Sequence, residues 1–302
     1  MPGGFTADYL LYDPHTRAVW VPAGSAGAVF VVDTAAQRAT PIAGFATAES
    51  ERNGKRRVVG PSSAALGDGV VYIGNRADAS ICAFADATLA KGACATLDSP
   101  PDGLAYAAGP RELWATTPRG KSIQILDGAT LQPKASVALA DGPEGIAVDA
   151  ARGRLYTNVN GATLAIDLAT RQTVATWAQG CGPDPDEPHG IRVDEAAGWL
   201  LVACSVKVQI LDAKAGTVLG SVATGSGGID DIDYDPRTHT LYAAASGGTL
   251  TIARIDPSGA GVVLATIPTA PRARNGVVDD VGRVYLANGS AGELLVVTPR
   301  VN

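Results

Sequence analysis

The strongest constraint on the fold is a sequence repeat of about 42 residues. A bulky residue that follows a short turn recurs seven times, at Trp20, Tyr72, Trp114, Tyr156, Leu201, Tyr242 and Tyr285. After each of the first six, an apolar stretch ends on an aspartate, at Asp33, Asp86, Asp127, Asp167, Asp212 and Asp256. A period of this length indicates that one supersecondary unit is repeated along the chain.

Each repeat contains four short segments with the pattern of β-strands. In the fourth repeat they are residues 145–148, 154–157, 163–166 and 173–176, in which apolar and polar residues alternate and β-branched side chains are frequent. The 36 glycines of the chain punctuate the turns between such segments. Seven four-stranded antiparallel units predict an all-β, seven-bladed β-propeller, which we expect to be a single domain over residues 1–302.

We expect the propeller ring to close near the two ends of the chain. The seventh repeat stops at Asn302 after its third strand, and about six residues precede the first strand of the first repeat. Three arrangements are open: residues 3–6 supply a fourth strand to the last blade, the last blade has three strands, or the sequence is shortened.

The composition excludes several classes of protein. With 46% hydrophobic and 18% charged residues, a chain of 302 residues can build a substantial core without metals or disulfides. The formal charge of −6 argues against a partner held through phosphates, and no apolar run approaches the ~20 residues that a membrane helix needs. We therefore expect neither a nucleic-acid partner nor a membrane span.

Three runs of the sequence point to a known family. Residues 156–158 (Tyr-Thr-Asn), 71–75 (Val-Tyr-Ile-Gly-Asn) and 284–288 (Val-Tyr-Leu-Ala-Asn) are each followed by an apolar strand. They resemble YVTN-type bacterial β-propeller repeats, and the resemblance covers essentially the whole chain. It implies a seven-bladed propeller from a family that includes surface proteins, binding proteins and enzymes.

The first residue of the first strand in each blade should lie at the mouth of the central channel. Aligning the repeats gives seven polar residues there: Asp8, Ser62, Asp102, Glu144, His189, Asp230 and Asn275. One interpretation is that these side chains are simply solvated, and that the glycines after four of them let inner strands pack closely. The other is a binding site, because two carboxylates ~5 Å apart repel by roughly 3 kcal/mol. Three or four of them around one mouth would either raise their pKa values or recruit a cation.

Carboxylate and amide oxygens with an imidazole are typical ligands of divalent cations, and calcium tolerates irregular geometry best. We expect Asp102, Glu144, Asp230 and Asn275 as metal ligands, with His189 or Glu144 as the catalytic base. This arrangement resembles the metal-dependent propeller lactonases, although many of those enzymes have six blades. The resemblance implies hydrolysis of an ester or lactone.

A small anionic or carbonyl-bearing substrate would also meet other residues at this mouth, and we expect Asp8, Ser62, Arg56 and Arg57 to contact it. The alternative function is a non-catalytic extracytoplasmic propeller that binds a protein or small molecule on the same face. A third possibility is that the acidic mouth captures a cationic organic ligand without any metal.

Two long linkers between repeats should emerge on the face of His189. Residues 46–57 are basic, and residues 179–188 carry Asp184, Asp186 and Glu187. They are either solvated loops of opposite charge or the rims of a pocket, in which the basic loop attracts an anionic substrate.

Farther along the first strands, Arg192 and Asp233 lie in adjacent repeats at equivalent positions that are otherwise apolar, which predicts an ion pair. His15 and His239 fall in turns on the opposite face, and we interpret both as turn residues.

The four cysteines suggest two disulfides, Cys82 with Cys94 and Cys181 with Cys204. Such pairing would indicate a periplasmic or secreted protein whose leader has been removed, whereas reduced thiols would fit the cytoplasm.

Overall fold

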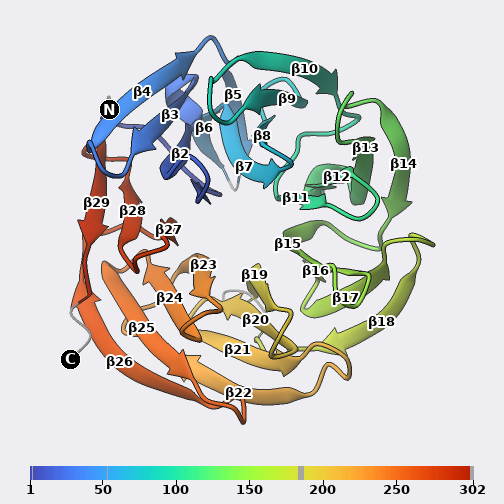
Figure 1. The fold of residues 1–302 in the computed structure, drawn as a ribbon, viewed down its shortest axis with the longest axis vertical. Helices are drawn as coiled ribbons and strands as arrows, with labels where there is room; N and C mark the ends of the chain where they lie inside the picture. The colour runs from blue at the N-terminus through green and yellow to red at the C-terminus, as the bar shows by residue number, and fades with distance from the viewer. Residues whose placement is uncertain (2, 53, 183–186, 300–302) are drawn as a thin grey trace. The chain divides into compact units, whose positions relative to one another are not determined.

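The computed structural model describes residues 1, 3–52, 54–182 and 187–299. Nearly all regular structure is β-strand, and seven successive antiparallel sheets follow the seven sequence repeats (Figure 1). The all-β, seven-bladed prediction is therefore confirmed. Two compact units divide the chain: unit 1 comprises Met1–Gly142 with Ala287–Leu295, and unit 2 comprises Pro143–Leu286 with Val296–Asn302.

Blades 1 to 3 belong to unit 1. Blade 1 contains β1 (Leu11–Asp13), β2 (Ala18–Ala23), β3 (Ala28–Asp33) and β4 (Arg38–Ala43), with the 3₁₀ turn η1 (Gly24–Ala26). Blade 2 contains β7 (Pro61–Gly67), β8 (Val70–Asn75), β9 (Ser80–Ala85) and β10 (Lys91–Thr96). Blade 3 contains β11 (Leu104–Ala107), β12 (Glu112–Thr117), β13 (Ser122–Asp127) and β14 (Pro133–Ala138), with η2 (Pro118–Gly120).

Blades 4 to 6 belong to unit 2. Blade 4 contains β15 (Pro143–Asp149), β16 (Arg154–Val159), β17 (Ala162–Asp167) and β18 (Thr173–Ala178). Blade 5 contains β19 (Pro188–Asp194), β20 (Trp199–Cys204), β21 (Lys207–Asp212) and β22 (Val218–Ala223). Blade 6 contains β23 (Ile229–Asp235), β24 (Thr240–Ala245), β25 (Thr249–Ile255) and β26 (Gly261–Pro268).

The seventh sheet has three strands in the described part of the chain: β27 (Gly276–Val278), β28 (Val284–Asn288) and β29 (Glu293–Val297). Residues 3–6 form no strand. Instead, within unit 1, the amides of Gly4 and Phe5 both donate to the carbonyl of Gly289, at 2.8 and 3.1 Å. Of the arrangements that the sequence left open, the structure thus has a three-stranded last sheet with the N-terminal segment bound to its β28–β29 turn.

The core is built mainly from the second and third strands of blades 1 to 6, which are largely buried on both faces, whereas β29 in the seventh sheet is not. The bulky repeat residue sits in the second strand and is almost fully buried at Trp20, Tyr72, Trp114 and Tyr156. The two tyrosines also contact the following blade. The Tyr72 hydroxyl donates to the carbonyl of Gly128 at 2.7 Å, and the Tyr156 hydroxyl donates to that of Ala213 at 2.8 Å. Burial raises the pKa of Tyr72 to about 12.

Both predicted disulfides are present. Cys82 and Cys94 face each other across β9 and β10, with their Cα atoms 4.1 Å apart. Cys181 and Cys204 join the segment before β19 to the end of β20, with a Cα separation of 5.5 Å. The second disulfide therefore anchors one end of the acidic linker, whose residues 183–186, including Asp184 and Asp186, lie outside the described residues.

The predicted basic loop before blade 2 is instead a β-hairpin of β5 (Ala48–Arg52) and β6 (Lys55–Val59). Glu51 pairs with Arg56 across the two strands, and the β-branched Val58 and Val59 favour extended backbone. The sequence signal that we missed is the dipeptide Asn53-Gly54, which is typical of two-residue hairpin turns.

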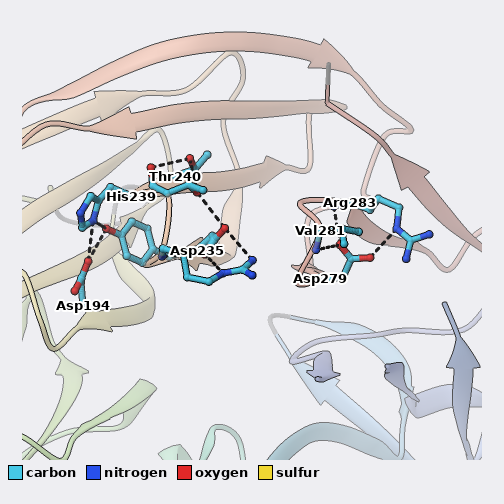
Figure 2. A network of polar contacts seen from close by, with 10 residues as sticks. Asp194, Asp235, His239, Thr240, Asp279, Val281 and Arg283 are labelled. Carbon is cyan, nitrogen blue, oxygen red and sulfur yellow. Dashed lines mark hydrogen bonds and ion pairs between the residues drawn. The ribbon is translucent and has the colours of Figure 1, made fainter. Parts of the chain in front are cut away.

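The turns after the first strands are held by buried aspartates. Figure 2 shows two of these networks in unit 2, around Asp194 and around Asp279. The Asp194 carboxylate accepts the Tyr234 hydroxyl at 2.8 Å and Nδ1 of His239 at 3.1 Å, so it joins blades 5 and 6. His239 is indeed a turn residue, and its contact with Asp194 shows that the turn also ties two blades together.

Candidate functional site at the first-strand starts

The structure places the seven predicted mouth residues at or just before the starts of the first strands. Asp8, Ser62 and Asp102 belong to unit 1, whereas Glu144, His189, Asp230 and Asn275 belong to unit 2. In four blades the strand carries a β-bulge at this point, around Ser62, Glu144, His189 and Asp230. A bulge changes the direction of a side chain, and bulges are frequent beside functional sites.

The glycines that follow Glu144 and His189 have a packing role. A Cβ on Gly145 would lie 2.5 Å from the carbonyl oxygen of His189, and a Cβ on Gly190 would lie 2.3 Å from Oδ1 of Asp231. Each bulge therefore packs directly against the bulge of the next blade in unit 2. The interpretation that these glycines let inner strands approach closely thus has a clear structural basis.

In unit 1, an arginine brings two of the predicted residues together. Arg76, in the turn after β8, places Nη2 2.5 Å from Oδ2 of Asp8 and also contacts Oδ1 of Asp102. Asp102 is buried, with 5% of its surface exposed, so this charged partner stabilises its ionised form. Sequence reasoning missed Arg76 because the alignment considered only first strands, whereas this long side chain comes from a turn.

Ser62 lies between the repeats of Asp8 and Asp102. Its Oγ is buried and has no hydrogen-bond partner among the described residues. The hydroxyl is therefore covered by its surroundings rather than presented to a ligand in this conformation.

In unit 2, two of the predicted residues, Asp230 and Asn275, lie next to each other. Nδ2 of Asn275 lies 3.3 Å from Oδ2 of Asp230, and Nη2 of Arg274 lies 3.1 Å from the same oxygen. The backbone at His189 is also fixed, because Asn158 donates its side-chain amide to the His189 carbonyl at 2.8 Å. Asn158 is the asparagine of the Tyr-Thr-Asn run, so its role here is to join two neighbouring blades.

The predicted ion pair between Arg192 and Asp233 is confirmed, with Nε 3.3 Å from Oδ1. The sequence analysis did not include Asp231, which accepts two parallel hydrogen bonds from Arg192, at 3.1 and 2.8 Å. Asp233 also accepts the backbone amide of Val278 at 2.7 Å, so the cluster joins blades 5, 6 and 7 within unit 2. The missed signal is that aspartate replaces the glycine found after Glu144 and His189.

This cluster carries one excess negative charge. Burial alone would lower the pKa of Arg192, but the carboxylates of Asp231 and Asp233 outweigh it and raise that pKa. Burial raises the pKa of Asp231 against the opposing effect of Arg192. The adjoining pocket, lined by both carboxylates, Tyr242 and aliphatic side chains, offers about 10 Å³ to the centres of water-sized molecules. That is room for about one water, not for a substrate.

A divalent cation needs several oxygen or nitrogen ligands around one point. Among the residues that the structure describes, no group of three or more His, Cys, Asp or Glu side chains is placed to hold a metal ion. Asn275 directs its amide nitrogen, a donor, to Asp230, and an arginine lies beside Asp230 and another beside Asp102. A guanidinium on a carboxylate competes with a cation for the same oxygens.

Comparison with known proteins defines the class of fold. No family model matches the chain, and no curated protein is similar to it in sequence. Among solved structures, one from Kuenenia stuttgartiensis hydrazine synthase has a TM-score of 0.78 at 15% identity and covers 100% of this chain and 97% of its own. One from the mitotic checkpoint complex has a TM-score of 0.77 at 12% identity, covering 96% and 90%.

A third similar structure, U3-55K, has a TM-score of 0.76 at 13% identity and covers 95% of this chain and 88% of its own. At these identities the likeness establishes the seven-bladed propeller fold and nothing finer. In the described part of the chain, no helix has the length and apolar character needed to cross a bilayer.

Proposed function

We propose that this chain is a non-catalytic, extracytoplasmic binding propeller of the YVTN type. Its ligand is an acidic segment of a partner protein, bound on the hairpin that precedes blade 2 in unit 1. The binding surface, here called the hairpin site, consists of Ser50, Arg57 and Arg119. Two disulfides support an oxidising compartment.

The observation that carries this proposal is the contact between the hairpin and blade 3. Arg119, in η2, donates from Nη2 to Oγ of Ser50 in β5 at 3.0 Å. The two ends of the hairpin are held as well, because Asn75 donates to the carbonyl of Ala46 and the Arg76 amide donates to the carbonyl of Gly60. The hairpin is thus attached at three points within unit 1.

Attachment matters because a fixed hairpin presents its charges in a defined geometry. Arg57 is exposed on β6 opposite Ser50, and Arg119, which contacts Ser50, is exposed on η2. Arg56 precedes Arg57 in the strand and therefore shares the other face of the hairpin with Glu51. Guanidinium groups bind carboxylates through paired hydrogen bonds, and a preorganised surface loses less entropy on binding. An acidic protein segment is the ligand chemistry that fits such a surface. In this proposal Arg76 is structural because it is held by Asp8 and Asp102, and the buried Ser62 does not contact the ligand.

One similar structure supports the proposal that the ligand is a protein. One similar propeller comes from a structure named as a complex, the mitotic checkpoint complex. Rigid propellers of this fold therefore do occur in protein assemblies, which is compatible with a protein ligand here.

A metal-dependent esterase or lactonase stays a prediction. It would use Asp102, Glu144, Asp230 and Asn275 around a divalent cation such as calcium, with His189 or Glu144 as base, and a small carbonyl-bearing substrate. Asp230 and Asn275 lie close together, but they meet through the amide nitrogen of Asn275 rather than through its oxygen. We rank this function second for that reason, and because Arg76 lies against Asp8 and Asp102 while Arg274 lies against Asp230.

The test uses fluorescence anisotropy with a fluorescein-labelled octaglutamate peptide, and octalysine as the probe of opposite charge. The expected result is salt-dependent binding of octaglutamate that weakens about tenfold in the double variant Arg57→Ala/Arg119→Ala. Arg38→Ala, an exposed arginine on the outer strand β4, is the matched control and should bind as the parent does. Equal binding by the double variant, or no binding by the parent protein, would overturn the proposal.

A further inference from the structure

The two disulfides differ in how open their sulfur atoms are to solvent. Cys94 is exposed on β10, the outermost strand of blade 2 (Figure 1), and its partner Cys82 on β9 is 8% exposed. In the other disulfide, Cys204 is fully buried, and Cys181 is partly buried against an apolar cluster of blades 4 and 5. Thiol–disulfide exchange requires a thiolate to reach one of the two sulfurs, so access limits its rate. Cys82–Cys94 is therefore the disulfide that a reductant can attack.

Packing holds β10 to its blade less strongly than it holds the other outer strands. The partly buried side chains of β10 are those of Ala93 and Ala95. The outer strands of blade 1 and of blades 3 to 6 each bury at least part of one larger side chain, namely Ile42, Val137, Trp177, Val222 and Ile267. Because apolar stabilisation follows the buried area, two alanine methyl groups stabilise the attachment of β10 less than these larger side chains do for their strands.

The backbone pairing of β10 is also interrupted. Its register with β9 shifts between Lys91 and Cys94, and Gly92 lies in this interval. A glycine inside a strand weakens it and is typical of such an irregularity. Cys94 then stands directly opposite Cys82, so the disulfide joins the two strands where regular pairing resumes. The covalent link thus supplies attachment that packing and pairing provide only weakly in β10.

We propose that Cys82–Cys94 is a thiol–disulfide exchange site, at which a dithiol reductant releases β10 from blade 2. One thiolate of the dithiol attacks Sγ of Cys94, the S–S bond breaks, and the electron pair leaves with Sγ of Cys82, which takes up a proton. The second thiol of the reductant then displaces Cys94, so the dithiol ends as a disulfide and both cysteines end as thiols. The strands β7, β8 and β9 stay in place, because their side chains are largely buried.

The first test follows the reduction of the whole, folded protein by dithiothreitol. Samples are quenched in acid at successive times, then unfolded and alkylated with iodoacetamide, and mass spectrometry identifies the cysteines that were reduced. Cys82 and Cys94 should become reduced at least about tenfold faster than Cys181 and Cys204. Equal rates for the two disulfides, or faster reduction of Cys181–Cys204, would overturn the proposal.

Amide hydrogen exchange of the selectively reduced protein tests whether the strand is released. Exchange should accelerate in β10 and stay unchanged in β14, the outer strand of blade 3, which contains no cysteine. Unchanged exchange in β10 would contradict the proposal. Acceleration throughout unit 1 would also contradict it, because the release would then not be local.

The double variant Cys82→Ala/Cys94→Ala removes the link without any reductant and should show the same fast exchange in β10. Cys181→Ala/Cys204→Ala is the matched control, since it removes the other disulfide, and its β10 should exchange as in the parent protein. Circular dichroism checks that both variants fold, and the selectively reduced parent provides the same comparison where one does not. Parent-like exchange of β10 in the folded Cys82→Ala/Cys94→Ala variant would refute the proposal.

Discussion

The carboxylate of Asp231 occupies the space that a side chain on Gly190 would need. A Cβ at position 190 would lie 2.3 Å from Oδ1 of Asp231 and 2.9 Å from its Cα. The Asp231 carboxylate cannot move away freely, because Arg192 donates hydrogen bonds to both of its oxygens. The two residues therefore constrain each other across the boundary between blades 5 and 6.

Gly190→Ala should consequently destabilise the protein by about 1–3 kcal/mol, the usual cost of overpacking. Urea unfolding measures the change. Gly109→Ala is the control, because a Cβ there meets no atom within 4 Å, and its free energy of unfolding should stay within about 0.5 kcal/mol of the parent. Equal stability of the two variants would contradict the close packing described here.

Arg192→Leu should cost about 3 kcal/mol, because it leaves the buried carboxylate of Asp231 without its charged partner. Asp231→Ala in the same background removes that stranded charge, so the double variant should be more stable than the sum of the two single effects implies. A double-mutant cycle in urea measures the coupling. Strictly additive effects would show that the pair makes no energetic contribution of its own.

His15, in unit 1, makes a pH-dependent contribution to the stability of the folded protein. Its hydrogen bond to Asp86, at 3.0 Å, together with the negative charge of that residue, raises the pKa of the imidazole above 6.5. The stabilisation by protonated His15 is therefore fully present below the pKa that this imidazole has in the unfolded chain. It is lost as the pH rises through the higher pKa of the folded protein.

NMR titration of the His15 ring should give a pKa above its ordinary value, and Asp86→Asn should lower it toward that value, leaving the smaller effect of Asp13. Asp78→Asn changes a carboxylate of blade 2 at the opposite end of β9 from Asp86, and it should leave the titration unchanged. An unaltered pKa in Asp86→Asn would refute the assignment of Asp86 as the cause.

Chelation separates the two proposed functions. If arginines compensate the first-strand carboxylates, treatment with EDTA should leave the melting temperature unchanged, and native mass spectrometry should find the mass of the protein alone. A bound divalent cation, with a melting temperature that falls on chelation and in Asp230→Asn, would instead favour the metal-dependent hydrolase.

The repeat allowed the sequence to predict the class of fold, because strand alternation and turn residues are local properties that recur seven times. The same alignment correctly placed the first-strand residues and paired Arg192 with Asp233. It could not identify Arg76, since the reach of a long side chain from a turn leaves no periodic signal. Asp231 was missed for a related reason: its role depends on the absence of a side chain in the preceding repeat, at Gly190.

The hydroxyls of Tyr72 and Tyr156 have a consequence for how the chain opens. Trp20 and Trp114 hold the equivalent position, but their buried indole N–H groups find no acceptor among the described residues. Neighbouring repeats are thus joined unequally, with an extra hydrogen bond where the bulky repeat residue is Tyr72 or Tyr156. Local fluctuations should begin preferentially beside the tryptophans, so amide hydrogen exchange would be faster there than beside these two tyrosines.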